Sequence, residues 1–278
     1  YSEPIKEELI LQRINDIKEK GGIAALSGTP QAAIKFKETL NNSKIDLFFL
    51  QGTVVSTEHL GEEGKETLNI KELCQSMKVP VIAGNCVTYD VAKLLMLAGV
   101  SGLMVGIGPG AACTSRGVLG IGVPQATAIS DCSLARDDFF KESGRYIPII
   151  GDGGIVTGGD ICKCLACGAD AVMIGSPIAK SSNAPGKGFH WGMATPSPIL
   201  PRGTRIEVGS TGPLERIIKG PALIDDGTHN LLGAIRTSMS TLGAQNIQEM
   251  QKVEIVIAPS LLTEGKVYQK AQQLGMGK

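Results

Sequence analysis

An excess of charge of either sign is missing from this 278-residue chain, since Lys plus Arg and Asp plus Glu both total 27. Without a net charge there is no long-range field to draw in nucleic acid or an anionic membrane, so any phosphate must be held by local groups. We therefore expect neither nucleic acid nor a membrane as a partner. A small anionic ligand is fully compatible with this composition.

Long hydrophobic runs are also missing. No segment reaches the ~18 uninterrupted apolar residues of a membrane span, and the first six residues, YSEPIK, have neither the basic cap nor the apolar stretch of a secretory signal. Apolar residues still make up 42% of the chain, which is enough to fill a sizeable core. These features predict a soluble globular protein of the cytoplasm.

A paired set of cysteines is missing as well, because the chain has seven, at positions 74, 86, 113, 132, 162, 164 and 167. An odd set fits reduced intracellular thiols better than a disulfide framework. Cys162, Cys164 and Cys167 are close enough in sequence to suggest a metal site. On a helix, however, positions 162 and 164 point about 200° apart, so we interpret these three as small buried core residues.

Alternation of apolar and polar residues with period two is nearly absent, which argues against a β-sandwich. Six short runs are instead apolar throughout, as expected for parallel strands covered on both faces, and each precedes a small polar loop and a helix candidate. These predicted strands lie at 23–26, 47–50, 79–83, 103–105, 147–150 and 171–174. Helical spacing also predicts helices over 8–17 and 228–239. The sequence thus predicts a parallel α/β fold.

Six units do not decide between an open doubly wound sheet and a closed (β/α)8 TIM barrel. Small residues with Asp, Asn or Cys follow several predicted strands, at 84–86, 106–113, 151–154 and 175–176. Barrels gather their sites from many strand ends, so this pattern favours the barrel. We expect one catalytic barrel domain over residues 1–278, with a Gly-, Pro- and Thr-rich lid or flap at about 181–220 and a tail at about 253–278 that docks on another subunit.

Residues 106–116, GIGPGAACTSR, place a cysteine in a glycine-rich loop directly after a predicted strand. The three glycines superficially resemble a dinucleotide fingerprint, but a proline interrupts them, the third glycine is misplaced, and no acidic residue ends a strand about 20 residues later. Cys113 could be a buried thiol that merely packs. Its polar, flexible surroundings are not needed for packing, and loop amides favour a thiolate, so we favour a nucleophile.

Asp152 follows a predicted strand and precedes two glycines, so its carboxylate would emerge at a strand end. Such a carboxylate can accept both hydrogens of a vicinal diol, as in ribose. Gly153 and Gly154, with Gly175 and Ser176 one unit later, could bind a phosphate, since the last two strands of a barrel commonly build such a site. The glycines could instead simply close tight turns, which would not explain their pairing with Asp152.

The chain has three histidines. His190, next to Trp191, could stack on a base or could anchor the lid, and the sequence favours neither. His59 and His229 have no second polar signal nearby and are interpreted as surface histidines or as histidines with satisfied hydrogen bonds.

Together these residues resemble the IMP dehydrogenase/GMP reductase family, and most of all its IMP-dehydrogenase-related branch without CBS domains. The resemblance covers nearly the whole chain, because many short motifs occur in the family's order. They lie at 84–85, 106–116, 120–125, 152–154, 158–160, 175–176, 192–193 and 219–221.

The resemblance implies a (β/α)8 barrel whose first two units would be absent from this chain, an NAD(P)(H) cofactor, a purine nucleotide monophosphate (GMP, IMP or XMP) as substrate, and a homotetramer or octamer. Cys113 would attack C2 of the purine, and the Ser115 hydroxyl would replace the family's catalytic threonine. The substrate would be bound by Asp152, Gly153, Gly154, Gly175, Ser176, Gly192 and Met193, the cofactor by Asn85, Gln51 and Gly106, and a potassium ion by the carbonyls of Gly108, Gly110 and Cys113.

The chain departs from the family at several positions. Ala111 replaces a serine that touches phosphate, Gln51 replaces an aspartate, and His190-Trp191 replaces an aromatic–arginine pair. Arg202 falls where reductases have an assisting glutamate. These departures affect the residues that would handle the cofactor and the phosphate.

Only 25 residues separate Met193 from Lys219, with no Arg-Tyr pair among them. The long hydrolytic flap of the family's dehydrogenases therefore looks absent, and we favour GMP reductase (GMP and NADPH to IMP and ammonia). IMP dehydrogenase (IMP, NAD and water to XMP and NADH) is the alternative, with Arg202 or Arg205 as the base. A catalytically silent purine-nucleotide sensor and an unrelated flavin or phosphosugar barrel also stay open, although Cys113 argues against both.

Overall fold

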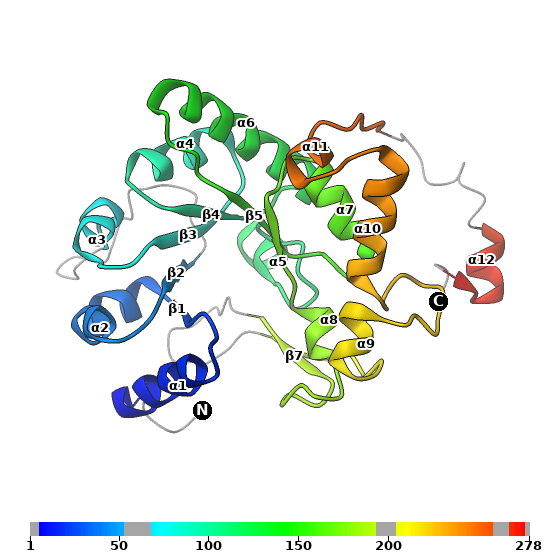
Figure 1. The fold of residues 1–278 in the computed structure, drawn as a ribbon, viewed down its shortest axis with the longest axis horizontal. Helices are drawn as coiled ribbons and strands as arrows, with labels where there is room; N and C mark the ends of the chain where they lie inside the picture. The colour runs from blue at the N-terminus through cyan, green and yellow to red at the C-terminus, as the bar shows by residue number, and fades with distance from the viewer. Residues whose placement is uncertain (1–5, 53–67, 193–203, 258–266, 276–278) are drawn as a thin grey trace. The chain divides into compact units, whose positions relative to one another are not determined.

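The computed structural model describes residues 6–52, 68–192, 204–257 and 267–275 of the chain (Figure 1). The chain divides into two compact units. The first unit comprises residues 1–107 and 131–150, and the second comprises residues 108–130 and 151–278. In the part of the chain that the structure describes, no helix is both long enough and apolar enough to cross a membrane.

Six strands form the larger sheet in the order β1-β2-β3-β4-β5-β6. Their bounds are β1 (Ala25–Gly28), β2 (Leu47–Gln51), β3 (Val81–Cys86), β4 (Gly102–Val105), β5 (Ile149–Asp152) and β6 (Ala171–Met173). The first four pair in parallel. A doubly wound sheet reverses its strand order at a switch point, whereas this order simply follows the sequence. The predicted α/β barrel class is therefore confirmed, with six successive strands of a partial barrel.

All six predicted strands are present, but three of them begin two residues later than the apolar runs suggest. Two of these late starts have a simple cause. Pro80 and Pro148 lack an N–H group and take part only as acceptors, from Phe48 N at 3.1 Å and Leu103 N at 3.0 Å. At their other ends, β3 and β5 extend through Asn85 and Asp152, residues that the sequence placed in loops.

The first unit packs its helices on β1 to β4. It holds α1 (Glu7–Glu19), which confirms the predicted helix at 8–17, and α2 (Pro30–Asn42), α3 (Ile70–Ser76), α4 (Tyr89–Leu97) and most of α6 (Gln125–Ser143). All four residues of β4 are buried, as expected for a parallel strand covered on both faces. Phe48, Leu50, Leu103 and Met104 are the largest fully buried side chains of these strands.

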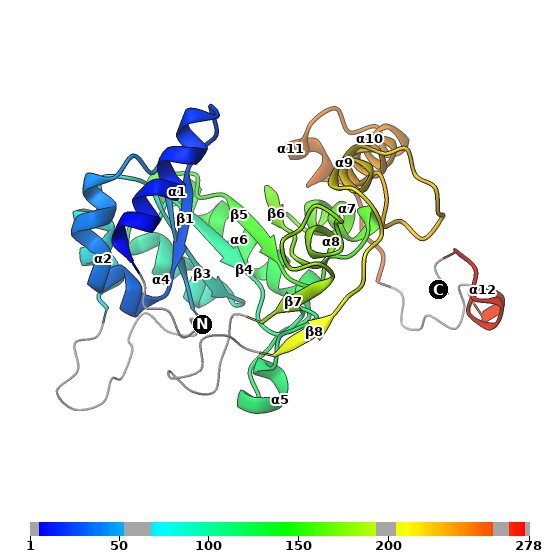
Figure 2. The same ribbon diagram turned by 90° about the horizontal axis from the view of Figure 1, so that it is seen from below.

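The second unit contains α5 (Ser115–Leu119), α7 (Gly158–Ala166), α8 (Ser176–Ala179), β7 (Phe189–Trp191), β8 (Arg205–Glu207), α9 (Leu214–Lys219), α10 (Leu231–Leu242), α11 (Ile247–Met250) and α12 (Val267–Gln272). The strands β7 and β8 form an antiparallel pair and lie side by side in Figure 2. The predicted lid at 181–220 thus contains a hairpin and a helix. The predicted helix at 228–239 begins three residues later, because Asn230 caps it in a left-handed conformation.

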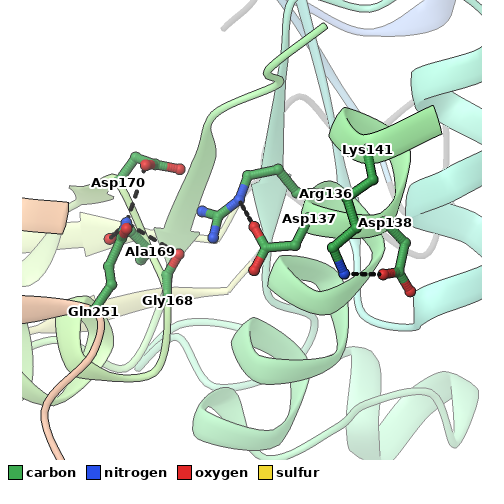
Figure 3. Close-up of polar contacts among 8 residues, drawn as sticks. All are labelled: Arg136, Asp137, Asp138, Lys141, Gly168, Ala169, Asp170 and Gln251. Atoms are coloured by element: carbon green, nitrogen blue, oxygen red, sulfur yellow. Dashed lines mark hydrogen bonds and ion pairs between the residues drawn. The ribbon is translucent and has the colours of Figure 1, made fainter. Parts of the chain in front are cut away.

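Figure 3 shows polar contacts within α6 and between the end of α11 and the turn that enters β6. On α6, in the first unit, Arg136 pairs with Asp137 and Lys141 with Asp138, both at 2.9 Å. In the second unit, Gln251 Nε2 donates to the carbonyl oxygen of Ala169 and to Asp170 Oδ1, both at 3.0 Å. This amide connects the end of α11 to the turn that enters β6.

The three clustered cysteines belong to α7 and its end. Cys162 and Cys164 are buried on this helix, as predicted for core residues, and Cys167 at its C-cap is partly exposed. The helix is fixed at its start by a capping box between Thr157 and Asp160.

Gly158 lets α7 approach α10 closely, and this contact predicts that a larger residue at this position destabilises the protein. A Cβ at Gly158 would collide with Cβ of Ala234, whereas a Cβ at the neighbouring Gly159 meets only Thr157 Oγ1, at 3.7 Å. We expect Gly158→Ala to lower the free energy of unfolding by about 1–3 kcal/mol through overpacking. Gly159→Ala, the matched control, should leave it unchanged or slightly higher. Chemical unfolding of both variants measures this, and equal stabilities would contradict the close packing.

Candidate functional site

The cysteine loop, residues 106–116, leaves β4 and turns into α5. Cys113 is partly exposed, and its backbone N–H donates to the Gly110 carbonyl at 3.0 Å. Its Sγ lies 3.4 Å from Oγ of Ser115, the buried first residue of α5. The two predicted catalytic side chains are therefore adjacent, and the hydroxyl can exchange a hydrogen bond with the sulfur.

The turn of Gly153 and Gly154 packs directly on the cysteine loop through Pro109. A Cβ at Gly153 would lie 2.9 Å from Pro109 Cγ, and one at Gly154 would lie 3.0 Å from Pro109 Cβ. Both glycines also have positive φ, 101° and 75°. Any side chain here would push the two segments apart. These glycines thus do more than close a turn, because they allow the half-buried Asp152 and the cysteine loop to approach.

His190 of β7 lies on the turn formed by Gly175 and Ser176. Its Nδ1 is 3.1 Å from Ser176 Oγ, and a Cβ at Gly175 would lie 3.2 Å from its Cε1 and Nε2 atoms. The imidazole is therefore a direct neighbour of two predicted phosphate-binding residues. Of the two roles left open by the sequence, this contact favours anchoring of the hairpin to that turn.

Trp191 faces the other side of the hairpin, as alternation along a strand requires. The Arg205 guanidinium on β8 stacks over the Phe189 ring at 3.8 Å and lies 5.7 Å from the Trp191 ring. The aromatic pair therefore holds Arg205 on the face opposite to His190.

Gly192 follows β7 and touches the residue next to the nucleophile candidate. A Cβ at Gly192 would lie 2.5 Å from the Ala112 carbonyl oxygen, and its N–H donates to Thr204 O at 3.0 Å. The hairpin thus reaches the cysteine loop at this point. Met193 and Arg202 lie outside the described residues, as does His59.

The predicted cofactor residues lie in the first unit. Asn85 Nδ2 donates to the Gly106 carbonyl at 2.9 Å, which brings these two residues together. Gln51, at the end of β2, accepts a hydrogen bond from Ser27 Oγ, and its Nε2 lies 3.7 Å from the Met104 sulfur. Amide side chains at these strand ends have the donors and acceptors that a nicotinamide carboxamide needs, so the residues present fit such a group.

Burial disfavours the thiolate form of three other cysteines. Burial raises the pKa of Cys74 to about 11 and that of Cys164 to about 12, and burial also raises the pKa of Cys167. His229 is buried with both ring nitrogens in use. Its Nδ1 accepts from Leu223 N at 3.3 Å and its Nε2 donates to Thr211 O at 3.1 Å. This confirms the interpretation of His229 as a satisfied histidine.

Sequence reasoning gave no role to Pro109 or Arg116 and left His190 undecided. Pro109 and Arg116 act through contacts with residues that are distant in the sequence or that have no side chain, so no local pattern shows them. The position of His190 two residues before a predicted site glycine was the one signal that pointed to it.

Comparison with known proteins identifies the class. Residues 11–194 match the IMP dehydrogenase / GMP reductase domain. An uncharacterised oxidoreductase of Mycobacterium tuberculosis is 39% identical over 261 residues, covering 92% of this chain and 69% of that protein. The inosine-5'-monophosphate dehydrogenase of Thermoplasma acidophilum is 37% identical over 213 residues, covering 72% of this chain and 42% of that enzyme.

A solved structure agrees with these matches. The crystal structure of an IMP dehydrogenase/GMP reductase-like protein from Corynebacterium glutamicum superposes with a TM-score of 0.83 at 36% identity, covering 92% of this chain and 67% of that one. The chain belongs to the IMP dehydrogenase/GMP reductase family and is an oxidoreductase of that type. The family binds purine nucleotide monophosphates and generally uses NAD(P)(H).

The different thiol environments predict an order of alkylation. With a limiting amount of iodoacetamide at pH 7.5, we expect Cys113 to react first, because burial raises the pKa of Cys74 and Cys167, the other partly exposed thiols. The rate at Cys74 should rise about tenfold per pH unit between pH 7 and 10, since its pKa of about 11 lies above this range. Peptide mass spectrometry resolves each site. Faster reaction at Cys74 or Cys164 at pH 7.5 would contradict this order.

Proposed function

We propose that the protein is a GMP reductase, which converts GMP and NADPH to IMP and ammonia through a purine bound covalently to Cys113. The observation that carries this proposal is the meeting of separate segments at the cysteine loop. Pro109 packs on the Gly153 and Gly154 turn, and Gly192 packs on Ala112 beside the thiol. Nucleotide-binding elements would thus surround one accessible sulfur.

Asp152 would bind the ribose, since a carboxylate accepts hydrogen bonds from both hydroxyls of a vicinal diol. The phosphate would lie at Gly154, Gly175 and Ser176, where backbone N–H groups and the hydroxyl are donors. His190 adds a ring nitrogen at that turn, 3.1 Å from Ser176 Oγ. Ala111 has no hydroxyl that could bind the phosphate. The His190 ring nitrogen would replace that missing polar group.

The Cys113 thiolate would form a bond to C2 of the guanine ring. The bond between C2 and the exocyclic amino nitrogen would then break, with a proton transferred to that nitrogen so that it leaves as ammonia. The Ser115 hydroxyl, 3.4 Å from the sulfur, is placed to relay that proton. The nicotinamide cofactor, when bound, supplies the hydride to C2. The C2–S bond then breaks, and its electron pair returns to Cys113 as thiolate while IMP is released.

Asn85, Gln51 and Gly106 are the residues proposed to orient the nicotinamide. Asn85 is held by its hydrogen bond to the Gly106 carbonyl, so its amide is fixed before a ligand binds. The carbonyls of Gly108, Gly110 and Cys113 are proposed to hold a potassium ion, because hard cations prefer oxygen ligands. The Gly110 carbonyl also accepts the Cys113 N–H, which ties any ion at these oxygens to the position of the thiol.

The hairpin supports the reductase direction. Residues 205–207 pair with 189–191 as β8 and β7, and α9 takes up residues 214–219. These paired and helical residues are therefore not part of a long hydrolytic flap of the kind that the resemblance assigns to dehydrogenases. Arg205, one candidate base for the IMP dehydrogenase alternative, is held in its stack on Phe189.

Removal of the nucleophile tests the covalent route. We expect Cys113→Ala to reduce turnover of GMP and NADPH by at least ~1,000-fold while GMP still binds, because only the covalent step is lost. Cys167→Ala, which removes a partly exposed thiol of the same unit, is the matched control and should retain wild-type turnover. NADPH absorbance and ammonia release measure the rate. Full turnover by Cys113→Ala would exclude the mechanism.

The same assay distinguishes the alternatives. NADH formation from IMP and NAD without GMP turnover would identify a dehydrogenase. Tight nucleotide binding without turnover in either direction would identify a sensor.

Asp152 tests the ribose contact. We expect Asp152→Asn to raise KM for GMP about 10- to 100-fold with a smaller change in kcat, since a hydrogen bond to a charged group contributes about 1.5–3 kcal/mol. Asp131→Asn, at an exposed position of α6, should leave both constants unchanged. Steady-state kinetics with GMP as the varied substrate measure the split. An unchanged KM would remove Asp152 from the substrate site.

A further inference from the structure

The helix that carries Ser115 is unusually short for a catalytic support. α5 comprises five residues and ends at Gly120 in the left-handed conformation. Isolated helices shorter than ~12–15 residues are marginal in water, so α5 depends on contacts outside itself. Val118 and Leu119 do not supply them, because they are 60% and 56% exposed. Something else must hold the end of the cysteine loop in place.

Arg116 supplies that contact with its aliphatic stem. A Cβ at Gly108 would lie 2.5 Å from Cγ and Nε of Arg116, and a Cβ at Gly122 would lie 2.5 Å from the same Cγ and 2.7 Å from Nε. The side chain therefore passes between the backbones of two glycines, one on each side of α5 in the sequence. Neither position has room for a second side chain while Arg116 stays there.

The guanidinium completes the connection. Arg116 Nη2 donates to the Val123 carbonyl at 2.9 Å, immediately after Gly122. The stem and the head group together connect the start of the cysteine loop, its end on α5, and the segment that enters α6. Residue 116 is three positions after Cys113 and one after Ser115, so displacement of this side chain would shift both.

We propose that Arg116 is a positioning residue that fixes the cysteine loop by threading between Gly108 and Gly122. The inference rests on the proposed function only in taking Cys113 as the nucleophile. Arg116 itself touches no reacting atom in this assignment. Its effect is to hold the Cys113 thiol and the Ser115 hydroxyl in one arrangement, which reduces the entropy lost on reaching a reactive geometry.

Gly122 makes the proposal testable with a small change. Its φ lies outside the left-handed region, so alanine is compatible with its backbone, and the close neighbours of the added methyl are atoms of Arg116. Gly117 on α5 is the matched control, because a Cβ there meets nothing within 4 Å. We would compare Arg116→Ala, Gly122→Ala, the double variant, Arg116→Lys and Gly117→Ala.

The readout is the iodoacetamide rate at Cys113, resolved by peptide mass spectrometry, with Cys74 and Cys167 as internal references. We expect Arg116→Ala and Gly122→Ala each to raise the Cys113 rate at least threefold, because the loop is released, while the reference thiols change less than twofold. The double variant should be no faster than the faster single variant. Arg116→Lys, which keeps the stem and a donor, should restore the rate toward wild type, and Gly117→Ala should match wild type.

Where GMP is turned over, kcat should fall at least tenfold in the two single variants, with less than a threefold change in KM. A Cys113 rate within twofold of wild type in the Arg116 and Gly122 variants would overturn the proposal. The proposal would also be overturned if the rate increases of the two single variants added in the double variant, or if the iodoacetamide rate at Cys167 rose as much as that at Cys113. Should Arg116→Ala lack a cooperative thermal transition, Arg116→Met is judged by the same criterion. If the iodoacetamide rates at Cys113 follow the expected pattern but the wild-type protein does not turn over GMP, the reductase proposal is rejected and the role of Arg116 stands.

Discussion

Close approach of glycine backbone to the cysteine loop is the constraint on which the second unit depends. Gly153 and Gly154 meet Pro109, and Gly192 meets the Ala112 carbonyl, at separations that leave no room for a Cβ. Side chains at Gly153 and Gly154 would push this turn away from the cysteine loop. The glycines therefore allow the segment that follows Asp152 to pack directly on the loop that carries the thiol.

Burial also determines which thiol is available for reaction. Burial raises the pKa of Cys74 and Cys164 to about 11 and about 12, so these thiols carry little thiolate near neutral pH. Cys113 is partly exposed on a loop outside any helix or strand, with a hydroxyl 3.4 Å from its sulfur. A loop gains this exposure at the expense of rigidity, and the threaded Arg116 side chain is the element that restores it.

The sequence was sufficient for the six strands of the larger sheet, because fully apolar runs follow a local rule. Fully apolar runs marked all six strands, and a cysteine among glycines marked the loop. It was insufficient for β7 and β8, since these strands, FHW and RIE, contain polar residues and are not apolar throughout. It was also insufficient for Pro109, whose contacts join distant segments, and for Arg116, whose contacts are with glycines and a backbone carbonyl and leave no side-chain pattern in the sequence.

The hairpin links the fold to the choice of reaction. His190 on one face contacts the Gly175 and Ser176 turn, while Phe189 and Trp191 on the other face hold Arg205. A segment with both faces engaged in this way must break several contacts before it can deliver a base to a covalent purine intermediate. Hydrolysis requires such a base together with an ordered water, whereas reduction requires only a hydride donor and the departure of ammonia. Under the proposed function the cost of opening the hairpin would fall on the dehydrogenase direction alone, which adds to the short segment between Met193 and Lys219 as a reason for favouring the reductase.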